Sequence, residues 1–173
     1  MLRNLAAFGL IGKQVAGGLS KSTSFAQSRS LIYKAPLRDI RFCLTEVLDA
    51  PKHFEKLGFD GADSDTIEMI IDETAKLCED VLAPLNEIGD QEGVSYDPKS
   101  ADVKTPRGFK DAWDQYVSGG WQALSVPKKY GGTGLPPSLK FVTSELIGTA
   151  NWAWGMYPGL SMGAINTLAL HAS

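Results

Sequence analysis

The longest helical pattern in the chain runs from Asp63 to Leu85. Its apolar side chains fall three and four residues apart, the spacing of one face of an amphipathic helix, and carboxylates occupy the opposite face. Ser64 or Asp65 is placed to cap the first turn. We therefore predict a helix whose buried face is formed by Ile67, Ile70, Ile71, Thr74, Leu77, Cys78, Val81, Leu82 and Leu85.

A shorter helix is expected between Pro36 and Pro51. Pro36 suits a first turn, and Pro51 lacks the amide hydrogen needed to continue a helix, so the regular part is predicted to end there. His53, which follows, has no second ligand near it in the sequence and is expected at the surface. The inward positions of this helix are expected to be Leu37, Ile40, Leu44, Val47 and Leu48, widened by Phe42 and Cys43.

Two more helices follow a polar loop at 89–106. The first is expected to be capped by Thr105 and closed by Gly119-Gly120, and the second runs from about Pro137 to Ala150. The first buries Phe109, Trp113, Tyr116 and Val117, and the second buries Leu139, Val142, Leu146 and Ile147. A short extended piece is expected at 121–126. Because no strand of convincing length is present, the predicted fold is an all-α helical bundle.

The segment from Asn151 to Ser173 is rich in aromatic and small residues and contains no Asp, Glu, Lys or Arg. Its second half has apolar and small residues at helical spacing. Large exposed apolar patches are uncommon on soluble monomers, so the segment is either a buried helix or the wall of an apolar pocket.

Composition narrows the function classes. The chain has 173 residues, of which 43% are hydrophobic and 21% charged, which is typical of one globular domain. The net charge of −3 gives no basis for nucleic-acid binding, and no apolar run is long enough to span a membrane. Cys43 and Cys78 lack metal-ligand spacing and are expected on buried helix faces.

Residues 1–32 have the composition of an organelle targeting sequence. They are rich in Ser and Ala and contain no acidic residue, the first being Asp39. This predicts a disordered mitochondrial transit peptide over 1–32, with an unstructured tail as the alternative. Its removal would leave an acidic mature surface, because it carries Arg3, Lys13, Lys21 and Arg29.

The glycine-rich segment 127–137, PKKYGGTGLPP, has two interpretations. A phosphate-binding loop requires a Lys-Ser/Thr pair and a helix directly after the glycines, whereas Leu135-Pro136-Pro137 follows here. The favoured interpretation is a tight connection in which glycine permits a close backbone approach.

Candidate catalytic residues are few. Glu145 is the one acid on a mainly apolar helix, and burial would raise its pKa and make it a possible base. The favoured interpretation is an acid near the surface or paired with Lys140. The carboxylates of the 63–85 helix are expected to be solvated and not to bind a metal. We therefore assign no catalytic, metal-binding or cofactor-binding residue.

Three ordered motifs resemble the amino-terminal part of acyl-CoA dehydrogenases, in the longer subgroup with an extra leading helix. They are Tyr33-Lys34-Ala35-Pro36-Leu37-Arg38-Asp39-Ile40-Arg41-Phe42, Val81-Leu82-Ala83-Pro84-Leu85-Asn86, and Pro127-x-x-Tyr130-Gly131-Gly132-x-Gly134-Leu135-Pro136. The run from Met156 to Ala164 and the ending Leu170-His171-Ala172-Ser173 also match. The resemblance covers 33–173 and implies a leading helical extension at 33–62 and an amino-terminal helical domain at 63–173, without the family's middle β domain and carboxyl-terminal domain.

The resemblance implies an FAD-dependent oxidoreductase that dehydrogenates acyl-CoA thioesters between Cα and Cβ in fatty-acid β-oxidation or related acyl catabolism. A glutamate takes the Cα proton and the flavin takes the hydride. The base and most flavin contacts belong to segments outside this chain, so the chain alone is expected to be inactive. The implied partners are acyl-CoA and an electron-transferring flavoprotein, with a homo-oligomeric whole protein in the mitochondrial matrix.

The chain is expected to supply one wall of the acyl pocket, formed around Trp154, Gly155, Tyr157 and Pro158. Plain core packing is the alternative role of these residues. For the whole chain, one alternative is a non-enzymatic helical module that binds a partner or an acyl chain without flavin. Another is an acyl-CoA oxidase-like relative that passes electrons to oxygen.

Overall fold

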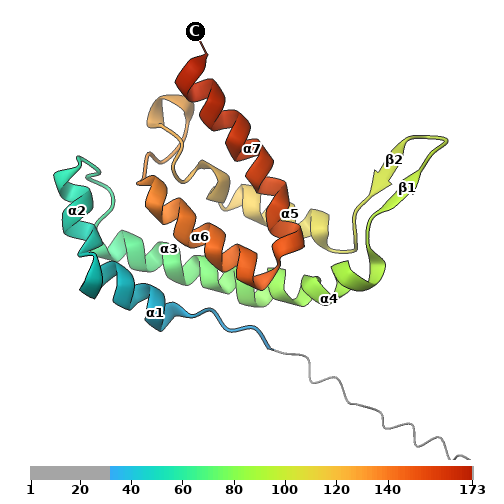
Figure 1. Cartoon of the computed structure of the whole chain (residues 1–173), viewed down its shortest axis with the longest axis horizontal. Coiled ribbons are helices and arrows are strands. Elements are labelled where there is room, and N and C mark those ends of the chain that lie inside the picture. The colour runs from blue at the N-terminus through green and yellow to red at the C-terminus, as the bar shows by residue number, and fades with distance from the viewer. Residues whose placement is uncertain (1–31, 173) are drawn as a thin grey trace, which may run out of the picture. The chain divides into compact units, whose positions relative to one another are not determined.

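The computed structural model describes residues 32–172, and the fold is mostly helical (Figure 1). The all-α prediction is confirmed for this part of the chain, with one short hairpin added. The transit peptide predicted for 1–32 falls almost wholly outside the described residues and stays a prediction. The elements are α1 (Leu37–Arg41), α2 (Ala50–Lys56), α3 (Ser64–Lys76), α4 (Ala83–Glu92), β1 (Ser95–Asp97), β2 (Asp102–Lys104), α5 (Phe109–Ser118), α6 (Pro137–Ala150) and α7 (Trp152–His171).

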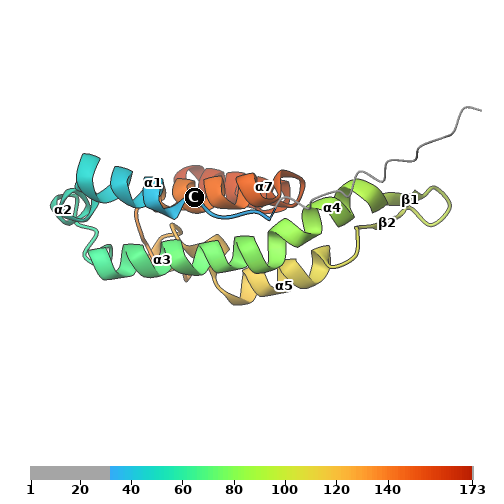
Figure 2. The same ribbon diagram turned by 90° about the horizontal axis from the view of Figure 1, so that it is seen from below.

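The helix predicted over 63–85 exists and is longer than expected. A π-helical segment, Leu77–Leu82, joins α3 to α4, so the three form one continuous rod (Figures 1 and 2). Asp63 caps it, because its backbone is extended and its carboxylate accepts the Thr66 amide at 2.8 Å. The predicted caps Ser64 and Asp65 are wrong, because both residues already lie inside the first turn.

The rod forms one side of two hydrophobic clusters. Its predicted inward residues are buried, apart from Leu77 and Val81, which are half-buried. The first cluster lies toward α5 and α7 and includes Cys78, Leu82, Phe109, Tyr116, Leu146 and Trp154. The second lies toward α1, α2 and α6 and includes Leu44, Phe54, Ile67, Ile71 and Leu139.

The leading helix departs from its prediction at its end. Leu44 is buried, but Val47 and Leu48 are each 61% exposed, and Phe42, also predicted to face inward, is 58% exposed. The helix widens into a π-helical segment over Phe42–Val47, whose extra residue per turn rotates the later positions away from the core. Pro51 does not end a helix; it lies in the first turn of α2, where a missing amide hydrogen costs nothing.

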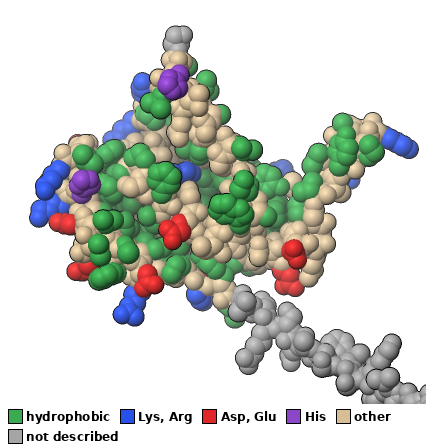
Figure 3. Space-filling model, in the orientation of Figure 1, with side chains coloured by type: hydrophobic (Ala, Val, Ile, Leu, Met, Phe, Trp, Pro, Cys, Tyr) green, Lys and Arg blue, Asp and Glu red, His purple; other side chains and the backbone are tan. Residues whose placement is uncertain are grey.

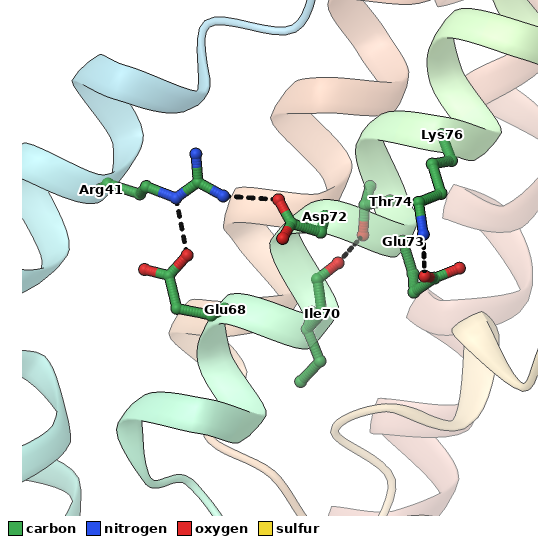
Figure 4. Close-up of polar contacts among 7 residues, drawn as sticks. All are labelled: Arg41, Glu68, Ile70, Asp72, Glu73, Thr74 and Lys76. Atoms are coloured by element: carbon green, nitrogen blue, oxygen red, sulfur yellow. Dashed lines mark hydrogen bonds and ion pairs between the residues drawn. The ribbon is translucent and has the colours of Figure 1, made fainter.

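Arg41 fixes α1 to the acidic face of α3. Its Nε donates to Glu68 at 2.6 Å and its Nη2 donates to Asp72 at 2.5 Å (Figure 4). Both carboxylates keep the predicted exposure to solvent, with side chains 39% and 48% exposed, and in addition they pair with Arg41. Within residues 32–172 no group of three or more His, Cys, Asp or Glu side chains is placed to hold a metal.

A second contact fixes the extended residues before α1. Glu79 accepts the Lys34 ammonium at 2.5 Å and the Ala35 amide at 2.9 Å. The Tyr33 hydroxyl lies 2.9 Å from Thr149 Oγ1 on α6. The leading segment is thus bound to both α3–α4 and α6.

The polar loop at 89–106 contains the hairpin. β1 and β2 pair antiparallel with Tyr96 opposite Val103, and all six strand residues are exposed. α5 begins at Phe109 after Gly108 in a left-handed conformation, so Thr105 is not its cap. Its inward side is formed by Phe109, Ala112 and Tyr116, with Trp113 half-buried and Val117 exposed.

Three smaller predictions have mixed outcomes. Cys78 is buried, which raises the pKa of its thiol to about 12, whereas Cys43 is exposed and that prediction is wrong. His53 is exposed, as predicted. The piece expected to be extended at 121–126 instead begins with a 3₁₀ turn, Trp121–Ala123.

No helix among residues 32–172 is long and apolar enough to cross a bilayer.

Candidate functional site

Asn151 sets the sharp turn between α6 and α7. Its side-chain oxygen accepts the Trp154 amide at 3.0 Å and caps α7, while its Nδ2 donates to the Leu82 carbonyl at 3.1 Å. Asn151 is 1% exposed, so both of its bonds lie in the interior. The start of α7 is therefore held directly against the α3–α4 rod.

Trp154 anchors α7 to α5. Its ring is fully buried, and its Nε1 donates to the Phe109 carbonyl at 3.2 Å. It packs edge-on against Tyr116, with ring centroids 5.4 Å apart, and Trp113 completes the group at 6.3 Å from Trp154. In the described residues Trp154 thus packs in the core and lines no groove.

An apolar groove of about 620 Å³ lies between α6 and α7, a volume typical of small-molecule sites. Gly155 and Pro158 line it, as do the exposed Phe141, Trp152 and Leu160. Apolar side chains are exposed on the face seen in Figure 3, which is viewed in the orientation of Figure 1. The groove is therefore open and mostly hydrophobic.

Glycines bring the two helices close at one end of this groove. A Cβ at Gly155 would lie 3.3 Å from Ile147 Cγ2, and one at Gly148 would lie 2.9 Å from the Trp152 ring. Pro158 lies inside α7, where it supplies no amide hydrogen to the helical ladder. Gly148 of α6 and Gly155 of α7 thus permit the close approach of the two helices at this end.

Tyr157 lies on another side of α7. It packs edge-on against Phe109 at 6.2 Å and lines a separate groove of about 430 Å³ with Thr105, Lys110, Trp113 and Ser161. The four residues predicted to form one wall therefore lie in three different places. Gly155 and Pro158 share the α6–α7 groove, Tyr157 borders the other groove, and Trp154 lies between them in the core.

Sequence reasoning missed Lys140 and Tyr116. Lys140 Nζ donates to the buried Tyr116 hydroxyl at 3.2 Å, and both residues line the α6–α7 groove. Burial lowers the pKa of the Lys140 ammonium and raises the pKa of Tyr116 to about 12. The sequence contained one indication of this placement. Lys140, Ser144 and Gly148 are spaced four residues apart and therefore lie on one face of the predicted helix.

The structure does not support a catalytic role for Glu145. Its side chain is exposed, and it makes no ion pair with Lys140, contrary to one of our two interpretations. The surface position that was the other interpretation is confirmed.

The glycine-rich loop is a packing device. A Cβ at Gly132 would lie 2.0 Å from the Val126 carbonyl oxygen, so only glycine fits. The amides of Gly132, Gly134 and Leu135 donate to backbone carbonyls of 124–127 and are not free to bind a phosphate. These residues therefore do not fit the pyrophosphate of FAD.

The described part of the chain is a mostly helical domain that presents an apolar groove lined by one half-buried lysine, Lys140. The chain belongs to the acyl-CoA dehydrogenase family, since residues 64–173 match the profile of the acyl-CoA dehydrogenase N-terminal domain. This confirms the resemblance found in the sequence.

Two curated relatives support the same family. The chain is 34% identical over 143 residues to a 3-methylmercaptopropionyl-CoA dehydrogenase of Ruegeria pomeroyi, covering 83% of this chain and 24% of that protein. It is 31% identical over 127 residues to a broad-specificity linear acyl-CoA dehydrogenase of Mycobacterium tuberculosis, covering 73% of this chain and 21% of that protein. The chain thus spans about a quarter or less of the length of these relatives.

Proposed function

We propose that this chain supplies one wall of the acyl pocket of an acyl-CoA dehydrogenase, an oxidoreductase that forms the α,β double bond of an acyl-CoA thioester. The observation that carries the proposal is the apolar α6–α7 groove, to which Gly155 and Pro158 contribute. The aliphatic part of an acyl chain is apolar, and such a groove removes its surface from water. Membership of the family supplies the reaction class.

The remaining machinery is proposed to lie in other parts of a longer protein. The amides of Gly132, Gly134 and Leu135 in the glycine-rich loop already donate to backbone carbonyls, and Glu145 is exposed. We therefore place the flavin, which accepts the hydride, and the catalytic base outside this chain. Electron-transferring flavoprotein as the acceptor, a homo-oligomeric state and a mitochondrial matrix location complete the proposal.

The role of the groove is tested by narrowing it. Gly155→Leu places a branched side chain in the lining of the groove, at a position where even a Cβ would lie 3.3 Å from Ile147 Cγ2. Gly163→Leu is the matched control, because Gly163 is on the same helix and a Cβ there meets nothing within 4 Å. Octanoyl-CoA is titrated calorimetrically into the 173-residue chain and its two variants.

The expected result is saturable binding that Gly155→Leu weakens by about tenfold and Gly163→Leu leaves unchanged, since several methylene groups lose their contact. Equal weakening by both variants, or binding unaffected by Gly155→Leu, would place the acyl chain elsewhere. Absence of octanoyl-CoA binding to the well-folded chain would overturn the pocket-wall proposal.

A further inference from the structure

The buried end of the α6–α7 groove holds a paired lysine and tyrosine that the pocket-wall role does not use. Tyr116 is 0% exposed, and its hydroxyl accepts a hydrogen bond from Lys140 Nζ at 3.2 Å. An ammonium carries three N–H donors and a phenol one O–H donor. After their mutual bond, the Lys140 ammonium retains two N–H donors, and the phenol retains its O–H beside them.

The charge of Lys140 is not balanced within the described chain. The ion pairs among residues 32–172 involve Lys34, Arg41, Lys52, Lys76, Arg107 and Lys110, and Lys140 is absent from them. Removing an ammonium from water without a counter-ion is unfavourable, and its lowered pKa reflects that cost. A negative charge brought into the groove would offset it.

The lining around the pair identifies the rest of the ligand. The groove is lined by Met156, Pro158, Leu160 and Met162 of α7 and by Phe141 and Ile147 of α6. A single cation beside such a surface suits a single negative charge on an apolar chain. A pyrophosphate, with several strongly hydrated charges, does not suit it.

We propose that Lys140 and Tyr116 bind a carboxylate carried by an aliphatic chain that lies in the α6–α7 groove. The assignment of this chain to an acyl substrate rests on the proposed function. A thioester carbonyl carries no net charge, so in an acyl-CoA the carboxylate would be a substituent of the acyl chain. The substrate class is therefore an acyl-CoA whose acyl group bears a second, free carboxylate.

The test compares two probes that differ in charge and not in length. Octanoate and octanamide are titrated calorimetrically into the 173-residue chain. Octanoate is expected to bind about tenfold or more tightly, because hydrogen bonds to a charged group are worth more than neutral ones. Lys140→Met is expected to abolish that preference while octanamide binding is unchanged, and Tyr116→Phe to reduce it.

The matched control is another lysine next to a tyrosine. Lys129 Nζ lies 4.7 Å from the Tyr130 ring centre, but both residues are exposed and lie outside the groove. Lys129→Met should leave both probes unaffected. Circular dichroism of each variant separates loss of binding from loss of folding.

Each outcome is decisive. Equal binding of the two probes by the unmodified chain would overturn the carboxylate assignment and leave the acyl groove standing. A preference for octanoate that survives Lys140→Met, or displacement of octanoate by inorganic pyrophosphate, would also overturn it. Failure of both probes to bind would remove the inference, and the octanoyl-CoA titration then decides the pocket-wall role separately.

Discussion

Asn151 shows how one side chain can fix the direction of a helix. Its oxygen caps α7 and its amide nitrogen bonds the rod at Leu82, so the side chain ties together two elements that are 69 positions apart in the sequence. Trp154, one turn later, adds a bond to α5 through Phe109. The placement of the groove thus depends on a few buried polar bonds as well as on hydrophobic contact.

Asn151→Ala is expected to destabilise the chain by about 1–3 kcal/mol, because it removes a helix cap and leaves the Leu82 carbonyl without its buried side-chain donor. Chemical unfolding followed by tryptophan fluorescence measures the change. Asn151→Ser, which keeps a capping oxygen, should lose less. An alanine variant as stable as the unmodified chain would contradict the role of this residue.

Gly132→Ala is expected to be more damaging, at about 3 kcal/mol or more, because the new Cβ would lie 2.0 Å from a backbone oxygen. Gly163→Ala is the comparison, since a Cβ there meets nothing and alanine favours a helix by up to about 1 kcal/mol. Thermal unfolding of the two variants should therefore shift in opposite directions. Equal shifts would contradict the close approach of Gly132 and Val126.

At the scale of elements, periodicity predicted the helices well and their ends poorly. The buried face of α3 follows directly from three- and four-residue spacing, and α6 has the predicted bounds. The errors at Val47 and Leu48 have one cause, a π-helical segment that changes the number of residues per turn. Helix propensities do not predict a π-helical segment, because the formation of such a segment depends on packing against other elements.

The leading segment is expected to loosen in acid. Hydrogen bonds from Lys34 and from the Ala35 amide lower the pKa of the Glu79 carboxyl from its ordinary value of 4.5. Because the pKa is lowered by folding, the contact contributes its full stabilising free energy above pH 4.5. This contribution is lost as the pH falls through the folded-state pKa. Limited proteolysis between Tyr33 and Leu48 should therefore accelerate below this pH.

The control for this experiment is Glu79→Gln, which removes the charge at every pH. Its leading segment should be cleaved faster than that of the unmodified chain at neutral pH and should respond less to acid. A variant that is protected equally at neutral pH would show that the Arg41 and Tyr33 contacts hold the segment without Glu79.

At the scale of the whole described chain, the site was harder to predict than the fold. Gly155 and Pro158 line the α6–α7 groove, Trp154 lies in the core and Tyr157 borders the other groove, so the prediction that the four form one acyl-pocket wall stays a prediction. These four residues were chosen because they lie close together in one apolar stretch of the sequence. Successive residues of a helix point in different directions around its axis, so the four side chains do not share one surface. Lys140 was missed because its partner Tyr116 lies 24 residues earlier, and only the fold brings them together.

The exposed apolar side chains of α7 are expected to make copies of the isolated chain associate with one another. Leu160 is 79% and Leu170 is 78% exposed, and patches of this kind mark contact surfaces. Light scattering is expected to show oligomers that shrink when both leucines are changed to glutamine. Val103→Gln on the hairpin, where the side chain is 61% exposed, is the control and should change nothing. A strictly monomeric unmodified chain would contradict the expectation.

The β1–β2 hairpin has a practical consequence. All of its strand residues are exposed, and neither hydrophobic cluster includes any residue from 93 to 104. An epitope tag or a fluorescent label inserted at the tip, between Asp97 and Asp102, would therefore leave both clusters and the lysine–tyrosine pair untouched. The hairpin therefore offers a position for a label that reports on this chain without altering its core.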